Sequence, residues 1–389
     1  MDFDLPAETV ALQRMCRDFA AKEIAPYAAE WSERCYFPAK VFRSLGELGL
    51  MGMLVEETYG GADAGLVSYV AAMEALGEAD QSVAAAWNAH STIGILPLAR
   101  FGTDEQKKRW LVPLATGEKL AAFGLTEPTA GSDAAGIRTR ARRTEDGWVL
   151  NGTKMFISNA GTEMSLGVTV LAVTGTDDNG RNRYGTFFVP DGTPGYDKGQ
   201  PLRKLGWHAL DTRELVFTDC WLPDDHLLGE EGNGLRQFLE VLDAGRVSVA
   251  ALSLSLAQAA LDLAIRHAED REQFGRPLNK FQAVGHKLAD MATEVEAARW
   301  LVYRAAWLGD QGRPYAQVAA MAKLYASEVA NRVASESVQI HGGYGFIRES
   351  AISRFYADAK ILEIGEGTSE VQRNVIARSL APSGKELPR

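Results

Sequence analysis

The hydrophobic pattern divides the chain into three zones with different periods. In the first zone, residues 5–119, apolar positions recur at i, i+3, i+4 and i+7, as in Leu12, Met15, Cys16 and Phe19. This spacing places them on one face of a helix. Turn-rich runs at residues 59–63 and 102–104 interrupt the pattern. We therefore predict an N-terminal helical domain.

The second zone, from about residue 120 to residue 223, has the pattern of strands. Short runs of β-branched and aromatic residues lie at 166–173, 184–189 and 214–217, with Gly/Pro/Asp-rich connectors between them. The Asn151-Gly152 pair stands between two β-favouring runs and is typical of a hairpin turn. These features predict an antiparallel sheet domain of about a hundred residues.

The third zone returns to helical spacing. Residues 245–267 are apolar on nearly all sides, which predicts a helix buried among others. Long helices are expected at 281–308 and 318–340. The predicted fold is therefore an α+β multidomain chain, with a helical domain at 1–119, an antiparallel β-sheet or barrel domain at 120–230, and a helical bundle at 231–389.

Composition and charge narrow the possible partners. The chain has 389 residues, and its 41 Lys and Arg face 51 Asp and Glu, for a net charge of −10. Such a chain repels phosphate backbones, so we expect no nucleic-acid partner. The basic run at residues 138–143 alternates with period two, and we interpret it as the solvated face of a strand.

The sequence also argues against disulfide, metal and membrane functions. Cys16, Cys35 and Cys220 are far apart and predict free thiols in a cytoplasmic protein. The six histidines lack the spacing of metal ligands. No basic leader precedes an apolar run, and no stretch approaches about 20 uninterrupted apolar residues, so neither a signal peptide nor a spanning helix is expected.

Several common catalytic motifs are absent. No complete G-x-G-x-x-G follows a predicted strand, and no G-x-x-x-x-G-K-[ST], H-E-x-x-H or G-x-S-x-G occurs. The sequence therefore gives no support for a Rossmann dinucleotide site, a P-loop ATPase, a zincin or an α/β-hydrolase.

Two segments rich in small residues could contact a ligand. Residues 123–136 (FGLTEPTAGSDAAG) offer hydroxyls and backbone N–H groups to a pyrophosphate or heterocycle. From composition alone, an ordinary strand-to-loop junction explains them at least as well. Residues 339–346 (QIHGGYGF) have three glycines that allow close approach of a ligand. A simple helix C-cap and turn fits them equally.

A third segment, residues 364–373 (IGEGTSEVQR), carries a carboxylate between two glycines. Thr368 is positioned to cap a helix that begins at Ser369, and such a helix N-terminus is suited to an anion. A solvated surface glutamate is the alternative interpretation of Glu366.

Together these segments, in this order, resemble the acyl-CoA dehydrogenase family over essentially the whole chain. The resemblance includes residues 48–53 with 59–61, 124–136, 211–217, 271–275, 339–358 and 366–368. It implies a helical domain, a β domain and a C-terminal four-helix domain. It also implies a homotetramer with one FAD per subunit.

The resemblance implies a reaction and a base. Members desaturate an acyl-CoA thioester to the trans-2-enoyl-CoA and pass electrons to an electron-transfer flavoprotein. Glu366 corresponds to the glutamate that removes the α-proton, while hydrogen bonds to the thioester carbonyl stabilise the developing enolate. Desolvation by bound substrate would raise the pKa of this carboxyl toward neutrality.

Further site residues follow by matching position. The resemblance implies FAD contacts from Phe123, Leu125, Thr126, Gly131, Ser132, Phe156, Ile157, Ser158, Arg271, Phe274, Gln282, Gln339, Ile340, Gly342, Gly343, Thr368, Ser369 and Glu370, partly across a subunit interface. It implies substrate contacts from Ser132, Asp243, Gly245, Arg246 and Gly367. Phe156 replaces a tryptophan of many relatives, so stacking is kept with less area.

Departures from related patterns restrict the subclass. Some members carry the base on a C-terminal-domain helix just before an arginine, but here Gly245 stands before Arg246 and cannot serve. Nitroalkane oxidases have Asp at the position of Glu366, and related monooxygenases lack the base. The arginine of glutaryl-CoA dehydrogenases aligns with Ala84, which disfavours a dicarboxylic substrate.

The acyl group and the electron acceptor stay open at this level. Gly365 replaces a tyrosine of many relatives, which either widens the pocket for branched chains or leaves space that a neighbour fills. We expect a short to medium, possibly branched, acyl chain. The alternatives are an acyl-CoA oxidase, an enzyme for carrier-protein thioesters, and a catalytically idle flavoprotein subunit.

Overall fold

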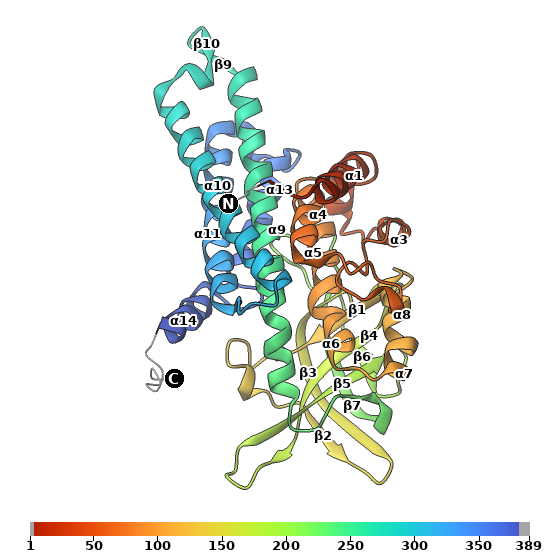
Figure 1. Ribbon diagram of the computed structural model, residues 1–389. Coiled ribbons are helices and arrows are strands. Elements are labelled where there is room, and N and C mark those ends of the chain that lie inside the picture. Colours follow the sequence, from red (N-terminus) through yellow and green to blue (C-terminus); the bar gives the residue numbers. More distant parts are fainter. Residues whose placement is uncertain (1–3, 381–389) are drawn as a thin grey trace.

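The computed structural model describes residues 4–380 and confirms the order of a helical, a sheet and a second helical region (Figure 1). The first region is built from short helices around a buried face that includes Cys16 and Ala20. Its helices are α1 Ala7–Glu23, α2 Ala28–Arg34, α3 Ala39–Glu47, α4 Gly65–Gly77, α5 Gln81–Ala89, α6 Leu96–Phe101, α7 Asp104–Gln106 and α8 Val112–Ala115, with π-helical turns at His90–Gly94 and Lys107–Leu111.

The middle region is one twisted sheet. Its strands are β1 Leu120–Gly124, β2 Arg140–Arg143, β3 Gly147–Ser158, β4 Ser165–Thr176, β5 Asn182–Pro190, β6 Tyr196–Lys198, β7 Thr212–Pro223 and β8 Leu227–Leu228. They are ordered β6-β7-β3-β2-β4-β5-β8, with β1 beside β4. Short 3₁₀ helices occur throughout the chain at Glu57–Tyr59, Ala134–Gly136, Asp224–His226, Leu278–Lys280 and Lys360–Glu363.

The predicted sheet domain is confirmed, and most of its strand pairs are antiparallel as expected, but not all of them. Both β1 and β2 pair with β4 in parallel, so the sheet is mixed. Parallel neighbours need a long connection, and the chain between β1 and β4 supplies one by way of β2 and β3. Residue patterns predict where strands lie but not their relative direction, which explains the error.

The predicted hairpin at Asn151-Gly152 was also wrong. β3 runs straight through this pair, and its register with β7 shifts there as in a β-bulge. Gly152 has φ +150°, and a Cβ at this position would overlap Thr139. The Asn151 side chain exchanges two hydrogen bonds with Asp219 on β7, at 3.1 and 2.9 Å. The Asn-Gly pair therefore shapes a bulge rather than a turn.

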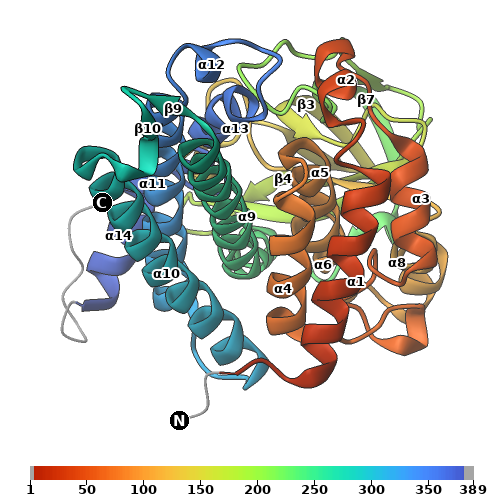
Figure 2. The same ribbon diagram turned by 90° about the horizontal axis from the view of Figure 1, so that it is seen from above.

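The C-terminal region surrounds one long central helix. Figure 2 shows α9 between the N-terminal helices and the pair α10 and α11. The elements are α9 Gly234–Asp270, the hairpin β9 Glu272–Gln273 and β10 Arg276–Pro277, α10 Gln282–Asp310, α11 Ala316–His341, α12 Gly343–Phe346, α13 Ala351–Ala359 and α14 Ser369–Leu380. The predicted long helices are confirmed.

The length and hydropathy of α9 would suffice to cross a membrane, which holds for no other helix within residues 4–380. However, 78% of its apolar stretch is buried inside the protein itself. Its side chains pack against α4, α5, α10 and α11 in the main hydrophobic core. The predicted burial on several sides is therefore confirmed, and α9 links the sheet to the bundle.

Candidate active site

Glu366 lies in a tight loop before α14. Its backbone has φ +52°, in the left-handed region that few non-glycine residues adopt, and Gly367 follows with φ +96°. The buried Gln372 side chain donates Nε2 to the carbonyls of Glu366 and Gly367, at 3.2 and 3.0 Å. Such strain persists only where the surroundings enforce it, and it is common at functional sites.

Lys323 provides a second anchor for this loop. Its side chain is fully buried on α11 and donates Nζ to the carbonyl of Gly367 at 2.7 Å. Burial lowers the pKa of Lys323 to about 8, although the Glu366 carboxylate opposes this shift. Thr368 caps α14 as expected, since its Oγ1 accepts from the backbone N–H of Val371 at 3.3 Å. The loop is therefore fixed on both sides of Glu366.

The two carboxylate oxygens of Glu366 have different surroundings. Oε1 accepts from Asn88 Nδ2 at 3.3 Å. Oε2 is enclosed by protein and has no hydrogen-bond partner within the described part of the chain. Burial raises the pKa of Glu366 to about 7, against the opposing effects of Lys323, Asn88 and Arg246. The carboxyl group is thus set to exchange a proton near neutral pH.

Gly245 on α9 makes room for this carboxylate. A Cβ at position 245 would overlap Oε2 of Glu366 and would also press on Ile93. The position where some relatives carry their base therefore faces the same space as the Glu366 carboxylate. A side chain at 245 and the observed placement of Glu366 exclude each other.

Four of the expected substrate contacts gather around Glu366. Asp243 and Arg246 form an ion pair on α9 that flanks Gly245, and Gly367 follows Glu366. The Arg246 side chain is largely buried, and its Nε has no hydrogen-bond partner among residues 4–380. Ser132 is exposed on the loop that follows β1.

Two polar residues near the carboxylate were missed by sequence reasoning. Asn88 and Tyr69 are buried, and Tyr69 Oη donates to Asn88 Oδ1 at 3.0 Å. Asn88 and Glu366 are 278 positions apart in the chain. No local spacing links such distant residues, so only the tertiary structure reveals this pairing.

The expected flavin-side residues lie on the sheet domain. Phe123 lies in β1, and Leu125 and Thr126 follow its end. The Met155 N–H donates to the Thr126 carbonyl at 2.8 Å, which joins this loop to β3. Phe156 has φ +62° and a 65% exposed side chain. An aromatic ring presented in this way is available to stack on a ligand. The exposed Gly131 and the half-buried Ser158 complete this set, whereas Ile157 points into the core.

A buried ion pair supports this loop from below. Glu127 Oε1 accepts from Lys154 Nζ at 2.8 Å, and both side chains are almost completely buried. The backbone N–H groups of Arg138 and Thr139 also donate to Glu127, at 2.6 and 2.9 Å. Burial acts to raise the pKa of Glu127, but Lys154 and these donors outweigh it and lower the pKa. Glu127 is therefore an internal brace rather than a ligand contact.

A second set of expected cofactor residues surrounds a pocket at the far end of the bundle. Arg271, Ile340, Gly342 and Gly343 line a cavity of about 500 Å³ together with other residues that include His267 and His341. Around Gly342 and Gly343, no atom of the described residues beyond their chain neighbours lies within 4 Å of the place where a Cβ would be. Other residues of this set are exposed nearby: Gln282, Gln339 and the 93% exposed Phe274 on the β9–β10 hairpin. Figure 1 shows this hairpin far from the sheet.

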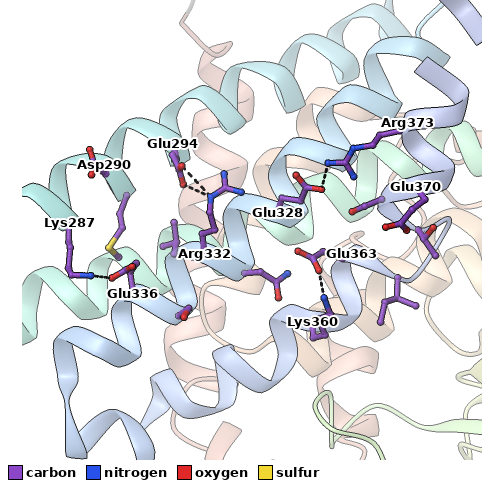
Figure 3. A pocket seen from close by; sticks show the side chains of 17 residues that line it. Lys287, Asp290, Glu294, Glu328, Arg332, Glu336, Lys360, Glu363, Glu370 and Arg373 are labelled. Carbon is purple, nitrogen blue, oxygen red and sulfur yellow. Dashed lines mark hydrogen bonds and ion pairs between the residues drawn. The ribbon is translucent and has the colours of Figure 1, made fainter. Parts of the chain in front are cut away.

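The third set of expected cofactor-binding residues borders a charged groove. Thr368, Ser369 and Glu370 line a groove of about 700 Å³ beside α10 and α11 (Figure 3). Ion pairs cross it, among them Arg332 with Glu294 and Arg373 with Glu328. Ser369 Oγ is buried without a hydrogen-bond partner among the described residues. The expected cofactor residues thus occupy three separate places on one chain.

Comparison with protein-family models covers nearly the whole chain. The acyl-CoA dehydrogenase N-terminal domain matches residues 6–118, the middle domain residues 122–220, and the C-terminal domain residues 232–381. A probable acyl-CoA dehydrogenase, YngJ, of Bacillus subtilis (strain 168) is 46% identical, over 98% of this chain and 100% of its own length. The human mitochondrial short-chain specific acyl-CoA dehydrogenase is 43% identical, over 98% and 92%.

Solved structures agree. Butyryl-CoA dehydrogenase from Megasphaera elsdenii superimposes with a TM-score of 0.94 at 42% identity, over 98% of this chain and 100% of that one. An acyl-CoA dehydrogenase from Bacillus anthracis complexed with FAD gives a TM-score of 0.90 at 34% identity, over 96% and 66%. A chain in a structure described as an electron transferring flavoprotein of Acidaminococcus fermentans gives 0.93 at 41% identity, over 98% and 99%. On the fold, the site and these matches, the chain belongs to the acyl-CoA dehydrogenase family.

Proposed function

We propose that this acyl-CoA dehydrogenase oxidises short-chain acyl-CoA thioesters, with Glu366 as the base that removes the α-proton. The observation that carries the proposal is the Glu366 carboxylate, whose Oε2 is enclosed and unpartnered among the described residues. A buried oxygen without a donor is a strong proton acceptor for a group placed against it. Curated relatives at similar identity are named short-chain specific enzymes.

The chain's own residues supply the proton chemistry. The C–H bond at the α-carbon breaks, the proton moves to Glu366, and its electron pair enters the new Cα–Cβ double bond. The cofactor is FAD, which when bound supplies the acceptor for the β-hydrogen and its electron pair. With a pKa raised to about 7, Glu366 is a stronger base than a solvated carboxylate while remaining partly ionised at neutral pH.

Residues of this structure fit FAD. The exposed ring of Phe156 on a strained backbone offers a stacking surface. Ser369 Oγ, which has no partner within residues 4–380, offers a hydrogen bond. Arg271 with the open glycines Gly342 and Gly343 suits a pyrophosphate. The expected cofactor residues around Phe156 on the sheet lie far from those around Arg271 near the β9–β10 hairpin (Figure 1). This separation supports a site completed by a second copy of the chain, as expected for a homotetramer.

Gly365 supports a preference within the short-chain class. Among the described residues beyond its two chain neighbours, the carbonyl oxygen of Ile361, at 3.5 Å, is the one atom within 4 Å of the place where a Cβ would be. Apart from the adjoining residues 364 and 366, no side chain of the described residues comes this close, which favours tolerance of branching near Cα and Cβ. The backbone at Gly365 is not left-handed, so Gly365→Tyr should fold normally.

A substrate panel tests the proposal. The FAD-loaded protein is mixed anaerobically with butyryl-, isobutyryl-, 2-methylbutyryl- and octanoyl-CoA while the flavin absorbance is recorded. We expect fast bleaching by butyryl-CoA and measurable bleaching by the branched esters, and Gly365→Tyr should slow the branched esters about tenfold more than butyryl-CoA. Branched esters that remain inert would refute the branching preference, and no bleaching by any ester would refute the activity.

A second step, the reoxidation of the enzyme reduced in this experiment, separates the possible electron acceptors. Similarity to the chain from the electron transferring flavoprotein structure supports an electron-transfer flavoprotein as the physiological acceptor. Reduced enzyme should then transfer electrons quickly to such a partner and reoxidise slowly in air. Fast reoxidation in air would instead identify an oxidase. The cytoplasmic location stays a prediction.

A further inference from the structure

A short chain of hydrogen bonds leads from the N-terminal domain to the Glu366 carboxylate. Asn88, on the last turn of α5, donates Nδ2 to Glu366 Oε1 at 3.3 Å and accepts from Tyr69 Oη on its other side at 3.0 Å. Tyr69 and Asn88 are buried, and Oε2 of Glu366 is enclosed.

Tyr69 fixes which end of the Asn88 amide faces the carboxylate. The Tyr69 ring is fully buried and stacks on Trp87, with centroids 4.6 Å apart and an angle of 16° between the planes. Trp87 is held in turn by its Nε1, which donates to the Leu50 carbonyl at 3.0 Å. Burial raises the pKa of Tyr69 well above 10, so the phenol keeps its proton and donates it. In this arrangement the amide oxygen of Asn88 accepts the proton, which leaves its NH₂ group for Glu366.

We propose that Asn88, oriented by Tyr69, is a positioning residue that occupies Oε1 of Glu366 and so makes Oε2 the oxygen that takes the substrate's α-proton. This inference rests on the proposed function. Oε2 faces the space beside Gly245, where a side chain would overlap it. A carboxylate anchored through one oxygen cannot rotate freely, and its remaining oxygen keeps a fixed direction.

The donor also favours the ionised base. The charged and titratable groups that face this carboxylate are Lys323 on α11, Arg246 with its partner Asp243 on α9, and Tyr69 on α4. Lys323 lowers the pKa of Glu366 more than Asn88 does, yet Lys323 donates to the Gly367 carbonyl. Among the described residues, Asn88 is the side chain with a direct hydrogen bond to the carboxylate.

The test compares three variants by the rate of anaerobic flavin bleaching with saturating butyryl-CoA, measured from acidic to alkaline pH. Asn88→Leu keeps the size of the side chain and removes the donor. Tyr69→Phe keeps the stacked ring and releases the amide. Ser253→Ala is the control, because it removes a buried α9 hydroxyl whose partner is the Val249 carbonyl, away from the site.

For Asn88→Leu we expect a rate about tenfold lower at pH 7 and a midpoint about one pH unit higher. The higher midpoint accounts for about fivefold of the loss at pH 7 and is recovered at alkaline pH. The lost orientation of the carboxylate accounts for the remaining loss of about twofold, which persists at every pH. Tyr69→Phe should lower the rate at pH 7 by about threefold and raise the midpoint by about half a pH unit. Ser253→Ala should change neither the rate nor the midpoint. The butyryl-CoA concentration for half-maximal rate should stay unchanged in all three, since none of these side chains is proposed to bind CoA.

Two results would overturn the proposal. One is an Asn88→Leu enzyme with the wild-type rate and midpoint. The other is an equal loss at every pH, which would show a general structural role. If Asn88→Leu does not retain FAD, the pH profile of Tyr69→Phe tests the proposal in its place. A wild-type midpoint in Tyr69→Phe then contradicts the proposal. A wild-type enzyme that no acyl-CoA bleaches refutes the proposed function instead.

Discussion

The buried Glu127 and the half-buried Glu366, whose Oε2 is enclosed, have opposite surroundings. Glu127, beneath the sheet-domain loop, accepts from Lys154 and from two backbone N–H groups. Glu366, in the loop before α14, accepts one 3.3 Å hydrogen bond from Asn88, and its second oxygen has no partner among the described residues. The pKa of Glu127 is lowered, whereas burial raises that of Glu366 to about 7.

The difference shows what distinguishes a structural carboxylate from a reactive one. Burial alone disfavours the charge on both groups. A cation and backbone donors offset that penalty at Glu127 and bind the charge in place. At Glu366 the penalty is only partly offset, so the group gains free energy by taking a proton. The number of donors, rather than burial, assigns the two roles.

Removing the reactive carboxylate should have the largest effect. Glu366→Gln keeps the size of the side chain but cannot accept the α-proton, so turnover with butyryl-CoA should fall by about 10²–10⁴-fold. FAD content and butyryl-CoA binding should persist. Steady-state kinetics and a flavin spectrum measure both, and a variant with full turnover would show that another group is the base.

Breaking the structural pair should instead affect stability. Lys154→Met leaves the charge of Glu127 buried without its cation and should cost about 3–5 kcal/mol in the free energy of unfolding. The double variant Glu127→Gln with Lys154→Met has no buried charge and should recover much of this loss. Urea denaturation measures both variants. Equal stability of the wild type and Lys154→Met would contradict the role of a brace.

Crowding the free oxygen should separate activity from stability. Gly245→Ala places a Cβ where Oε2 lies, and displacing the carboxylate by about 1 Å should slow turnover by about tenfold to a hundredfold. The control is Gly285→Ala on α10, where the nearest atom to a Cβ is 3.9 Å away. If both variants keep the wild-type rate, Gly245 does not determine the position of the base.

The smallest expected effect is a change in the pH dependence of stability. Because the pKa of Glu366 rises from 4.5 to about 7 on folding, the native state binds more protons than the unfolded state between these values. The contribution of the Glu366 carboxyl group to the free energy of unfolding is therefore present below pH 4.5 and is lost as the pH rises through 7. Glu366→Gln should be more stable than the wild type at pH 8 by about 1 kcal/mol or more and nearly equal at pH 4.5. Thermal unfolding at both pH values tests this sign.

The sequence predicts the order of the domains well but not the pairing within the sheet. Helical and strand periods are local properties, so α9, α10, α11, β4 and β5 lie where the patterns indicate. The parallel pairing of β1 and β2 with β4 depends on the path of the chain. The Asn151-Gly152 pair, whose composition is typical of a turn, instead shapes a bulge because Thr139 and Asp219 lie beside it.

The candidate site is likewise predictable from the sequence where its signal is local, and not where it depends on packing. Glu366 between two glycines stands out locally, and the family resemblance gives its role. Asn88, Tyr69 and Lys323 are ordinary residues of helices in the sequence, and only packing brings them to the loop. The resemblance indicates Glu127 as part of a signature, but the structure shows that its side chain faces inward.

The most direct test of this account is an infrared pH titration of the Glu366 carboxyl group, recorded as the difference between the wild type and Glu366→Gln. We expect its protonated C=O band to disappear with a midpoint near pH 7, and no such band from Glu127 across the same range. A Glu366 midpoint at or below 4.5, the value of an ordinary glutamate, would contradict the claim that missing donors make this carboxylate the base.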